Sequence, residues 1–275
     1  GVAEYGITVR WDKTYLTLIR IILQRQQRFA MQGGIRFGGT LTVEDIWELG
    51  YSHLVLAVGA GLPKALAIPN SLAPGMRQAS DFLMNLQLTG AHKNKHQVNL
   101  DVSCPAVIIG GGLTGVDTAT EVKAYYIQQI QNYRETYFRI ENAGAKTQFM
   151  EQLSPAERKV SRQWLADADA LMQASKDEFA QVADRVSEVS ILYRRSVQES
   201  PAYRKNPEEL AYAMREGILY RDQLKPDRLV LDENGHVKGL IASSEEGQVQ
   251  VDALNVFVAT GARPNIAYAY EHSQT

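Results

Sequence analysis

The 275-residue sequence contains one cysteine, Cys104. A single cysteine excludes an intrachain disulfide, and with it a redox-active cysteine pair. Because Cys104 comes just before an apolar segment, we expect it to be an ordinary packing residue. The near absence of cysteine also favours a cytoplasmic location.

Long apolar runs and excess charge are missing as well. No apolar run approaches the roughly 20 residues that a transmembrane helix requires. The first residues, Gly1-Val2-Ala3-Glu4-Tyr5-Gly6, do not resemble a signal peptide and read as the interior of a longer chain. A formal net charge of −2 gives no electrostatic reason to expect a nucleic acid or an anionic membrane as partner. With 45% hydrophobic and 22% charged residues, the composition predicts a globular chain of one or two domains.

Histidines are scarce too, at five. His92 and His96 have the spacing of helical metal ligands, but no carboxylate accompanies them and lysines lie between them. We therefore predict no metal site.

The most informative segment begins with the apolar run Ala106–Ile109 and continues as Gly110-Gly111-Gly112-Leu113-Thr114-Gly115. A strand, the pattern Gly-x-Gly-x-x-Gly and a helix start are what a dinucleotide pyrophosphate needs. The first glycine allows a tight turn, the second lets the backbone approach the phosphates, and the third lets helix and strand pack closely. The free N–H groups and dipole of the helix N-terminus favour an anion. The competing interpretation is a purely structural strand–helix turn.

The periodicity of apolar residues elsewhere alternates between that of helices and that of strands, which predicts an α/β fold. We expect helices over residues 14–28, 42–46, 80–90, 116–144, 154–186 and 206–217, with Thr42, Ser80 and Ser154 as caps. We expect strands over residues 35–37, 53–61, 189–193 and 255–258, and a hairpin turn at 232–235.

The two longest predicted helices form an antiparallel helical hairpin inserted at about residues 126–186. Such a pair more often completes a core than forms a binding surface. Its length, however, exceeds what a crossover helix needs, so a partner or dimer surface stays open as a second interpretation.

Basic residues follow the second strand of the nucleotide unit, where the adenosine ribose binds. Arg194 and Arg195 come directly after Tyr193, and Arg204 and Lys205 are nearby. Because paired guanidinium groups suit a dianionic phosphate, we favour NADP over NAD. The alternative is a solvated basic turn.

Four segments resemble one family when taken together: "LVLAVGAGLPKALAIPN", "VIIGGGLTGVDTATE", "YRRSVQESPAYR" and "VFVATGARPN". In this order they resemble the glutamate synthase small-subunit type of FAD- and NADPH-dependent oxidoreductase, a flavoprotein with two dinucleotide-binding domains. The resemblance spans nearly the whole chain apart from the helical insertion.

The resemblance implies a role for each matching position. Gly110 to Gly115 would hold the NADPH pyrophosphate, and Arg194 and Arg195 the 2′-phosphate. Strand ends at Gly59 and at Ala259-Thr260-Gly261 would be the crossings between the FAD and NADPH domains. Residues 1–62 would be part of an FAD domain, residues 63–260 the Rossmann-like three-layer NADPH domain, and residues 261–275 a return segment.

The resemblance implies hydride transfer from NADPH to FAD in the intact protein, with no catalytic side chain. The family's first glycine fingerprint, which binds FAD, is missing from this sequence, so we expect a fragment of a larger flavoprotein that is inactive alone. Its partners would be the rest of that protein and an electron-acceptor domain or subunit. Two alternatives are a non-catalytic interaction module that uses the hairpin, and a nucleic-acid binder, which the overall charge disfavours.

Overall fold

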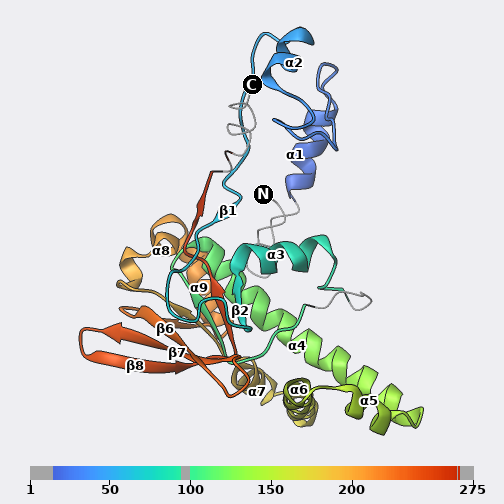
Figure 1. Cartoon of the computed structure of the whole chain (residues 1–275), viewed down its shortest axis with the longest axis vertical. Helices are drawn as coiled ribbons and strands as arrows, with labels where there is room; N and C mark the ends of the chain where they lie inside the picture. The colour runs from blue at the N-terminus through green and yellow to red at the C-terminus, as the bar shows by residue number, and fades with distance from the viewer. Residues whose placement is uncertain (1–14, 94–99, 265, 267–275) are drawn as a thin grey trace. The chain divides into compact units, whose positions relative to one another are not determined.

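The computed structural model describes residues 15–93, 100–264 and 266. The described residues divide into two units: Ala65–Gly261 form one, and those up to Lys64 together with those from Ala262 onward form the other. Figure 1 shows both, coloured along the chain. Each unit is considered by itself.

The first unit is built on a parallel sheet of five strands in the order β2-β9-β3-β4-β5. Their bounds are β2 (Met76–Gln78), β3 (Ala106–Ile109), β4 (Val189–Leu192), β5 (Leu219–Arg221) and β9 (Asn255–Val258). The three central strands are buried along their whole length. Burial on both faces is typical of a parallel sheet between two other layers.

A second sheet covers one face of the first. It is antiparallel, in the order β6-β7-β8, and consists of β6 (Lys225–Leu231), β7 (Val237–Ser244) and β8 (Gly247–Asp252). Val107 and Ile109 of β3 share a buried cluster with Leu229 and Leu240 of this sheet. Side chains alternate across a strand, so Ile108 faces the other way.

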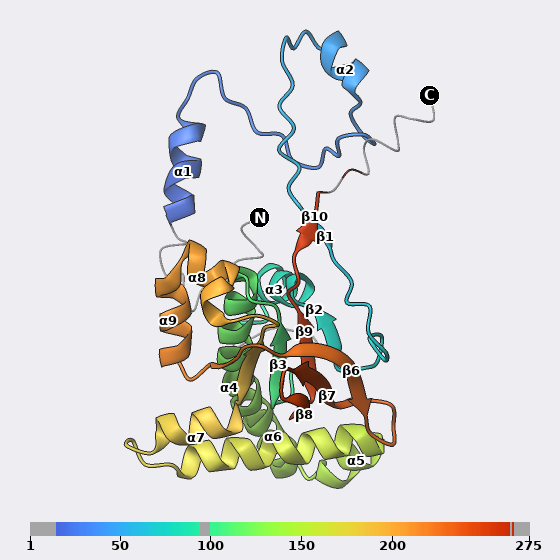
Figure 2. The same cartoon turned by 90° about the vertical axis from the view of Figure 1, so that its left-hand side faces the viewer.

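Helices cover the opposite face. Ile108 shares its cluster with Val116 and Ala119 of α4, and with Phe82 of α3. The helices of this unit are α3 (Ala79–Leu88), α4 (Leu113–Asn142), α5 (Lys146–Gln152), α6 (Pro155–Gln173), α7 (Phe179–Val186), α8 (Pro201–Lys205) and α9 (Pro207–Arg215), with a 3₁₀ turn at Val197–Glu199. Helices, parallel sheet and antiparallel sheet make the predicted three-layer α/β fold (Figure 2).

The helical insertion contributes to this core. Tyr126, Ile130 and Trp164 belong to the same cluster as the sheet residues. The Tyr126 hydroxyl donates a hydrogen bond to Asp167 (2.6 Å), and the Trp164 indole donates to the Val102 carbonyl (3.1 Å). Burial raises the pKa of Tyr126, which keeps this hydroxyl a donor. The inner part of the insertion is therefore a structural element of the unit.

The second unit contains α1 (Tyr15–Gln24), α2 (Val43–Glu48) and an antiparallel pair, β1 (Leu62–Pro63) with β10 (Ala262–Arg263). Thr42 caps α2 in a reciprocal box with Asp45, as predicted. The apolar side chains of α1 are all partly or fully exposed.

Two predicted strands of this unit are wrong. Residues 35–37 make only an isolated bridge, Phe37 to Leu41, because a tight turn bends the chain there. Residues 53–61 form no strand, and Val55 is 85% exposed. An apolar run becomes a strand only against a partner, and no described segment pairs with this one.

Two helix predictions in the first unit also need correction. The helix predicted over 154–186 breaks after Gln173, where Ala174 is extended (φ −66°, ψ 135°), and α7 begins at Phe179 with no side-chain cap. Between the two helices, the Ser175 N–H and hydroxyl donate to the Glu178 carboxylate. Ser80 is not the cap of α3, which starts one residue earlier, at Ala79, after Gln78, whose side chain makes no capping hydrogen bond. The predicted Ser154 capping box and the stops at Gly144 and Gly217 are confirmed.

Candidate functional site

Three strand ends meet at one edge of the parallel sheet. Ile109 is in register with Leu192 of β4 and with Val258 of β9. The Gly110 N–H donates to the Leu192 carbonyl (3.0 Å), and the Ala259 N–H donates to the Ile109 carbonyl (2.8 Å). The fold thus brings the glycine turn, the arginines after β4 and residues 259–261 to the same carboxyl edge. Open α/β sheets bind ligands outside this edge.

The first and third glycines of the turn are required by the protein itself. Gly110 has φ of +137°, and a Cβ there would lie 2.3 Å from the Ala259 carbonyl oxygen. A Cβ on Gly115 would lie 2.5 Å from the Gly110 carbonyl oxygen. Any side chain at either position would collide with backbone, so these glycines let β9 and α4 pack closely against the turn.

Gly112 is different. Its φ of −92° and ψ of 169° suit any residue, and a Cβ there would meet no protein atom within 4 Å. Neither conformation nor packing explains a glycine at this point. A ligand that approaches the backbone would explain it, because a methyl group would occupy the space the ligand needs.

The start of α4 offers free donors beside Gly112. No side chain caps this 30-residue helix. Gly115 and Val116 donate to the Gly112 carbonyl, and no hydrogen bond from the N–H of Leu113 or Thr114 occurs among the described residues. Unpaired N–H groups at the positive end of a helix dipole attract an anion. The residues present therefore fit a pyrophosphate.

The arginines predicted for a 2′-phosphate follow β4 and are exposed. Arg195 faces Glu199 at 3.8 Å, a solvated pair that contributes little. The Arg194 guanidinium makes no hydrogen bond or ion pair within the described part of the chain. The backbone beneath them is fixed, because Leu224 donates to the Tyr193 carbonyl (3.0 Å) and Gln223 to the Arg195 carbonyl (3.1 Å).

Arg204 is carried by α8, a helix that was not predicted from the sequence. The Ala202 N–H in its first turn donates to the Gly111 carbonyl (2.9 Å), which brings α8 to the glycine turn. The signal was present in the sequence, because Ser200-Pro201 is a cap followed by proline at the first helical position. Tyr193, whose ring packs on Gly111, was also missed as a site residue.

The remaining predicted site residues are placed less tightly. Thr260 and Gly261 continue from Ala259 and are exposed. Gly59 belongs to the second unit and lies in a segment without strand structure, so its role at a domain crossing stays a prediction.

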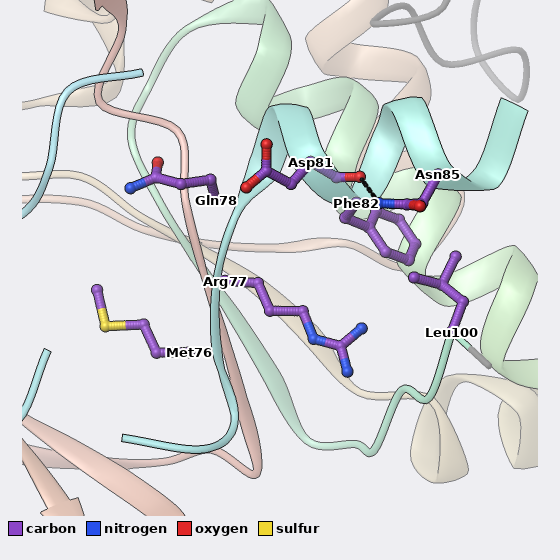
Figure 3. Close-up of a pocket in the computed structure, with 7 residues that line it drawn as sticks. All are labelled: Met76, Arg77, Gln78, Asp81, Phe82, Asn85 and Leu100. Carbon is purple, nitrogen blue, oxygen red and sulfur yellow. Dashed lines mark hydrogen bonds between the residues drawn. The ribbon is translucent and has the colours of Figure 1, made fainter. Parts of the chain in front are cut away.

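Two cavities lie outside the glycine turn. One cavity, of about 450 Å³, lies between β2 and α3. Figure 3 shows that Arg77 extends under Phe82 toward Leu100 and that the Asn85 side chain donates a hydrogen bond to the Asp81 carbonyl. The other, of about 810 Å³, lies between the insertion and the β6–β7 turn, at the amino ends of the strands, and also includes Arg77. Neither includes a residue of the glycine turn.

The cysteine and histidine predictions concern residues outside this site. Cys104 is buried, and burial raises the pKa of its thiol far above the usual range, so it is a packing residue as predicted. A ring nitrogen of His92 donates to the Leu86 carbonyl (2.9 Å), and His96 lies outside the described residues. Among the described residues no group of three potential metal ligands occurs, and no helix is long and apolar enough to cross a membrane.

Comparison with known proteins places these features in a family. The family model described as pyridine nucleotide-disulphide oxidoreductase matches residues 19–275. A curated relative, the uncharacterized protein RP006 of Rickettsia prowazekii (strain Madrid E), is 36% identical over 241 residues, which are 87% of this chain and 33% of the relative. The chain therefore spans about a third of that protein's length.

Among solved structures, the fold is similar to that of FprA, a Mycobacterium tuberculosis oxidoreductase whose structure revealed a covalent modification of NADP⁺. The TM-score is 0.54 at 17% identity, over 96% of this chain and 62% of FprA. The His57Gln mutant of FprA gives a TM-score of 0.55 with the same identity and coverage.

Proposed function

The chain belongs to the pyridine nucleotide-disulphide oxidoreductase family, and from this premise we propose that it is the NADPH-binding portion of a flavin-dependent oxidoreductase. The observation that carries the proposal is Gly112, a glycine that the protein's own packing does not require, at the uncapped start of α4. In this proposal the N–H groups of Leu113 and Thr114 bind the pyrophosphate.

Arg194 and Arg195, with Arg204 from α8, are proposed to bind the 2′-phosphate of the adenosine ribose. Exposed guanidinium groups on a fixed backbone suit a dianionic phosphate. The modified NADP⁺ found in FprA, a protein of similar fold, supports the same choice of cofactor. A solvated basic turn would make no distinction between NADPH and NADH.

The larger assignment rests on the resemblance and on the family. Residues 63–260 would be the NADPH domain, with residues 1–62 and 261–275 contributing to an FAD domain. The described residues of the second unit form two short helices and a two-residue strand pair, which do not by themselves make a flavin site. We therefore propose FAD only for the intact protein, as in the glutamate synthase small-subunit type.

When both cofactors are bound, they supply the hydride chemistry. The chain's own residues position the nicotinamide dinucleotide through the pyrophosphate and the 2′-phosphate. No side chain is proposed to transfer a proton. The electron acceptor and final substrate would be determined by parts of the protein beyond this chain.

The interaction-module alternative is less well supported. The inner face of the insertion is core, since Tyr126, Ile130 and Trp164 pack against the sheet. Its exposed apolar residues, Phe138, Met172 and Phe179, lie on different helices. If the insertion recruits a partner, it does so in addition to completing the fold.

The test is the affinity of the full chain for NADPH and NADH, measured by calorimetry. We expect tighter NADPH binding, and we expect Arg194→Ala with Arg195→Ala to remove the preference. Arg139→Ala removes an exposed charge some 40 Å along α4, given a rise of about 1.5 Å per residue, and serves as the control. Equal weak binding of both cofactors, unchanged in the double variant, contradicts the NADPH assignment.

A further inference from the structure

Gly111, the variable position of the glycine motif, is a glycine for a reason of its own. Its φ is not in the left-handed region, so its conformation does not demand glycine. A Cβ at Gly111 would instead lie 2.6, 2.8 and 2.9 Å from the Cδ2, Cγ and Cε2 atoms of Tyr193. The ring of Tyr193 thus packs directly on the backbone of the glycine turn, and no larger residue leaves room for it.

Gly111 has a second contact with the basic segment. Its carbonyl accepts the hydrogen bond from the Ala202 N–H at 2.9 Å. Tyr193 precedes Arg194 and Arg195 directly, and Ala202 precedes Arg204 by two positions. One glycine therefore contacts the chain just before Arg194 and Arg195 and again just before Arg204.

Tyr193 is itself held from the opposite side. Its N–H donates to the Arg221 carbonyl (2.9 Å), and its carbonyl accepts from Leu224 (3.0 Å). With the backbone of Tyr193 fixed by the segment after β5, its ring is the part that spans from β4 to the glycine turn. Its hydroxyl is only at the limit of a hydrogen bond, 3.5 Å from the Glu199 carbonyl, so the ring matters more than the hydroxyl.

We infer that Tyr193 is a positioning residue that sets the separation between the pyrophosphate turn and the 2′-phosphate arginines, and that Gly111 is the contact it requires. The inference rests on the proposed NADPH site. In NADPH the adenosine ribose joins the two phosphate groups at a limited separation, so donors for both must keep a matching distance. NADH lacks the second phosphate and is indifferent to that distance. Tyr193 would then act on cofactor choice, through the arginines, rather than on dinucleotide binding in general.

The experiment measures dissociation constants for NADPH and NADH with the full chain, by calorimetry. Tyr193→Ala is expected to weaken NADPH binding about tenfold, the loss of roughly one charge-assisted contact, and to change NADH binding less than about twofold. Tyr193→Leu, which keeps apolar packing in case the alanine variant does not fold, is expected to act in the same direction. Tyr193→Phe keeps the ring and is expected to match the wild type with both cofactors.

Gly111→Ala completes a double-mutant cycle with Tyr193→Ala. Alone, its methyl group must displace the ring, so NADPH binding is expected to weaken more than NADH binding. Combined with Tyr193→Ala, the methyl group meets no ring and is expected to cost nothing further. Two results would overturn the inference. One is a double variant whose loss of NADPH affinity equals the sum of the losses in the two single variants. The other is an NADPH-to-NADH affinity ratio that stays unchanged in Tyr193→Ala and Tyr193→Leu. A wild-type chain without NADPH preference would overturn the proposed function, and the inference with it.

Discussion

Replacing Gly112 with alanine adds one methyl group at a point where no protein atom lies within 4 Å. Alanine caps a helix less well than glycine, which costs up to about 1 kcal/mol. Alanine also restricts the unfolded chain more than glycine does, which raises the free energy of unfolding by about 0.4–1 kcal/mol. The two terms nearly cancel, so we expect the melting temperature of Gly112→Ala to stay within about 3 °C of the wild type, at roughly 2–4 °C per kcal/mol for a unit of this size.

The same methyl group occupies the space proposed for the pyrophosphate. Losing one charge-assisted hydrogen bond costs about 1.5–3 kcal/mol. That loss corresponds to a roughly 10- to 150-fold weaker Kd for NADPH. NADH should weaken by the same factor, because both cofactors share the pyrophosphate.

Gly115→Ala is the matched control, since it adds the same group in the same turn. Its Cβ would lie 2.5 Å from the Gly110 carbonyl oxygen, so α4 must move away from β3. Overpacking of this kind costs about 1–3 kcal/mol, which lowers the melting temperature by several degrees. Calorimetric melting and titration of both variants measure the two effects. A Gly112→Ala variant that binds NADPH as the wild type does would refute the assignment of Gly112 to the pyrophosphate.

Three further outcomes follow from the packing and the titratable groups. Trp164→Ala should lower the unfolding free energy by about 3–5 kcal/mol in urea titrations while the folded variant keeps its NADPH affinity; a loss near zero would show that the insertion is not part of the core. Burial raises the pKa of Asp167, so its carboxyl is more easily protonated in the folded chain than in the unfolded one. The stability that this carboxyl contributes below about pH 4 is therefore lost as the pH rises through its folded-state pKa. Asp167→Asn should therefore gain stability relative to the wild type as the pH rises from below the unfolded-state pKa of about 4 through the raised folded-state pKa, and a difference that shrinks over this rise would contradict that sign. Thr42→Ala should cost α2 about 1 kcal/mol, seen as faster hydrogen exchange over residues 43–48 with unchanged exchange in α6.

Features set by a few neighbouring residues could be predicted from the sequence. Ser154 and Glu157, or Thr42 and Asp45, satisfy each other's backbone groups wherever the chain folds, so the starts of α6 and α2 were predictable. The strand, glycine turn and helix start at 106–115 were predictable because their signal lies in consecutive residues.

Features that depend on distant partners were not. The apolar run at 53–61 has the composition of a buried strand, but Val55 is exposed because no described segment pairs with it. The edge strand β2 has only three residues and gives no periodic signal, so its pairing with β9 is visible only in the fold.

The candidate site divides in the same way. The glycine turn and the two arginines are each short runs of consecutive residues, so the sequence alone predicted them as site residues. The packing of Tyr193 on Gly111 joins residues 82 positions apart, with the whole insertion between them, and it depends on the register of β4 beside β3. The break after Gln173 was missed because no side chain caps α7, so the sequence offered no start signal there.

The most direct measurement is hydrogen exchange of the full chain, followed by mass spectrometry, with and without each cofactor. The proposed site requires that NADPH slow exchange in two separate segments, residues 110–115 and 194–204, and that NADH protect mainly the first. Protection by NADPH around Arg77 and α3, with none at the glycine turn, would contradict it.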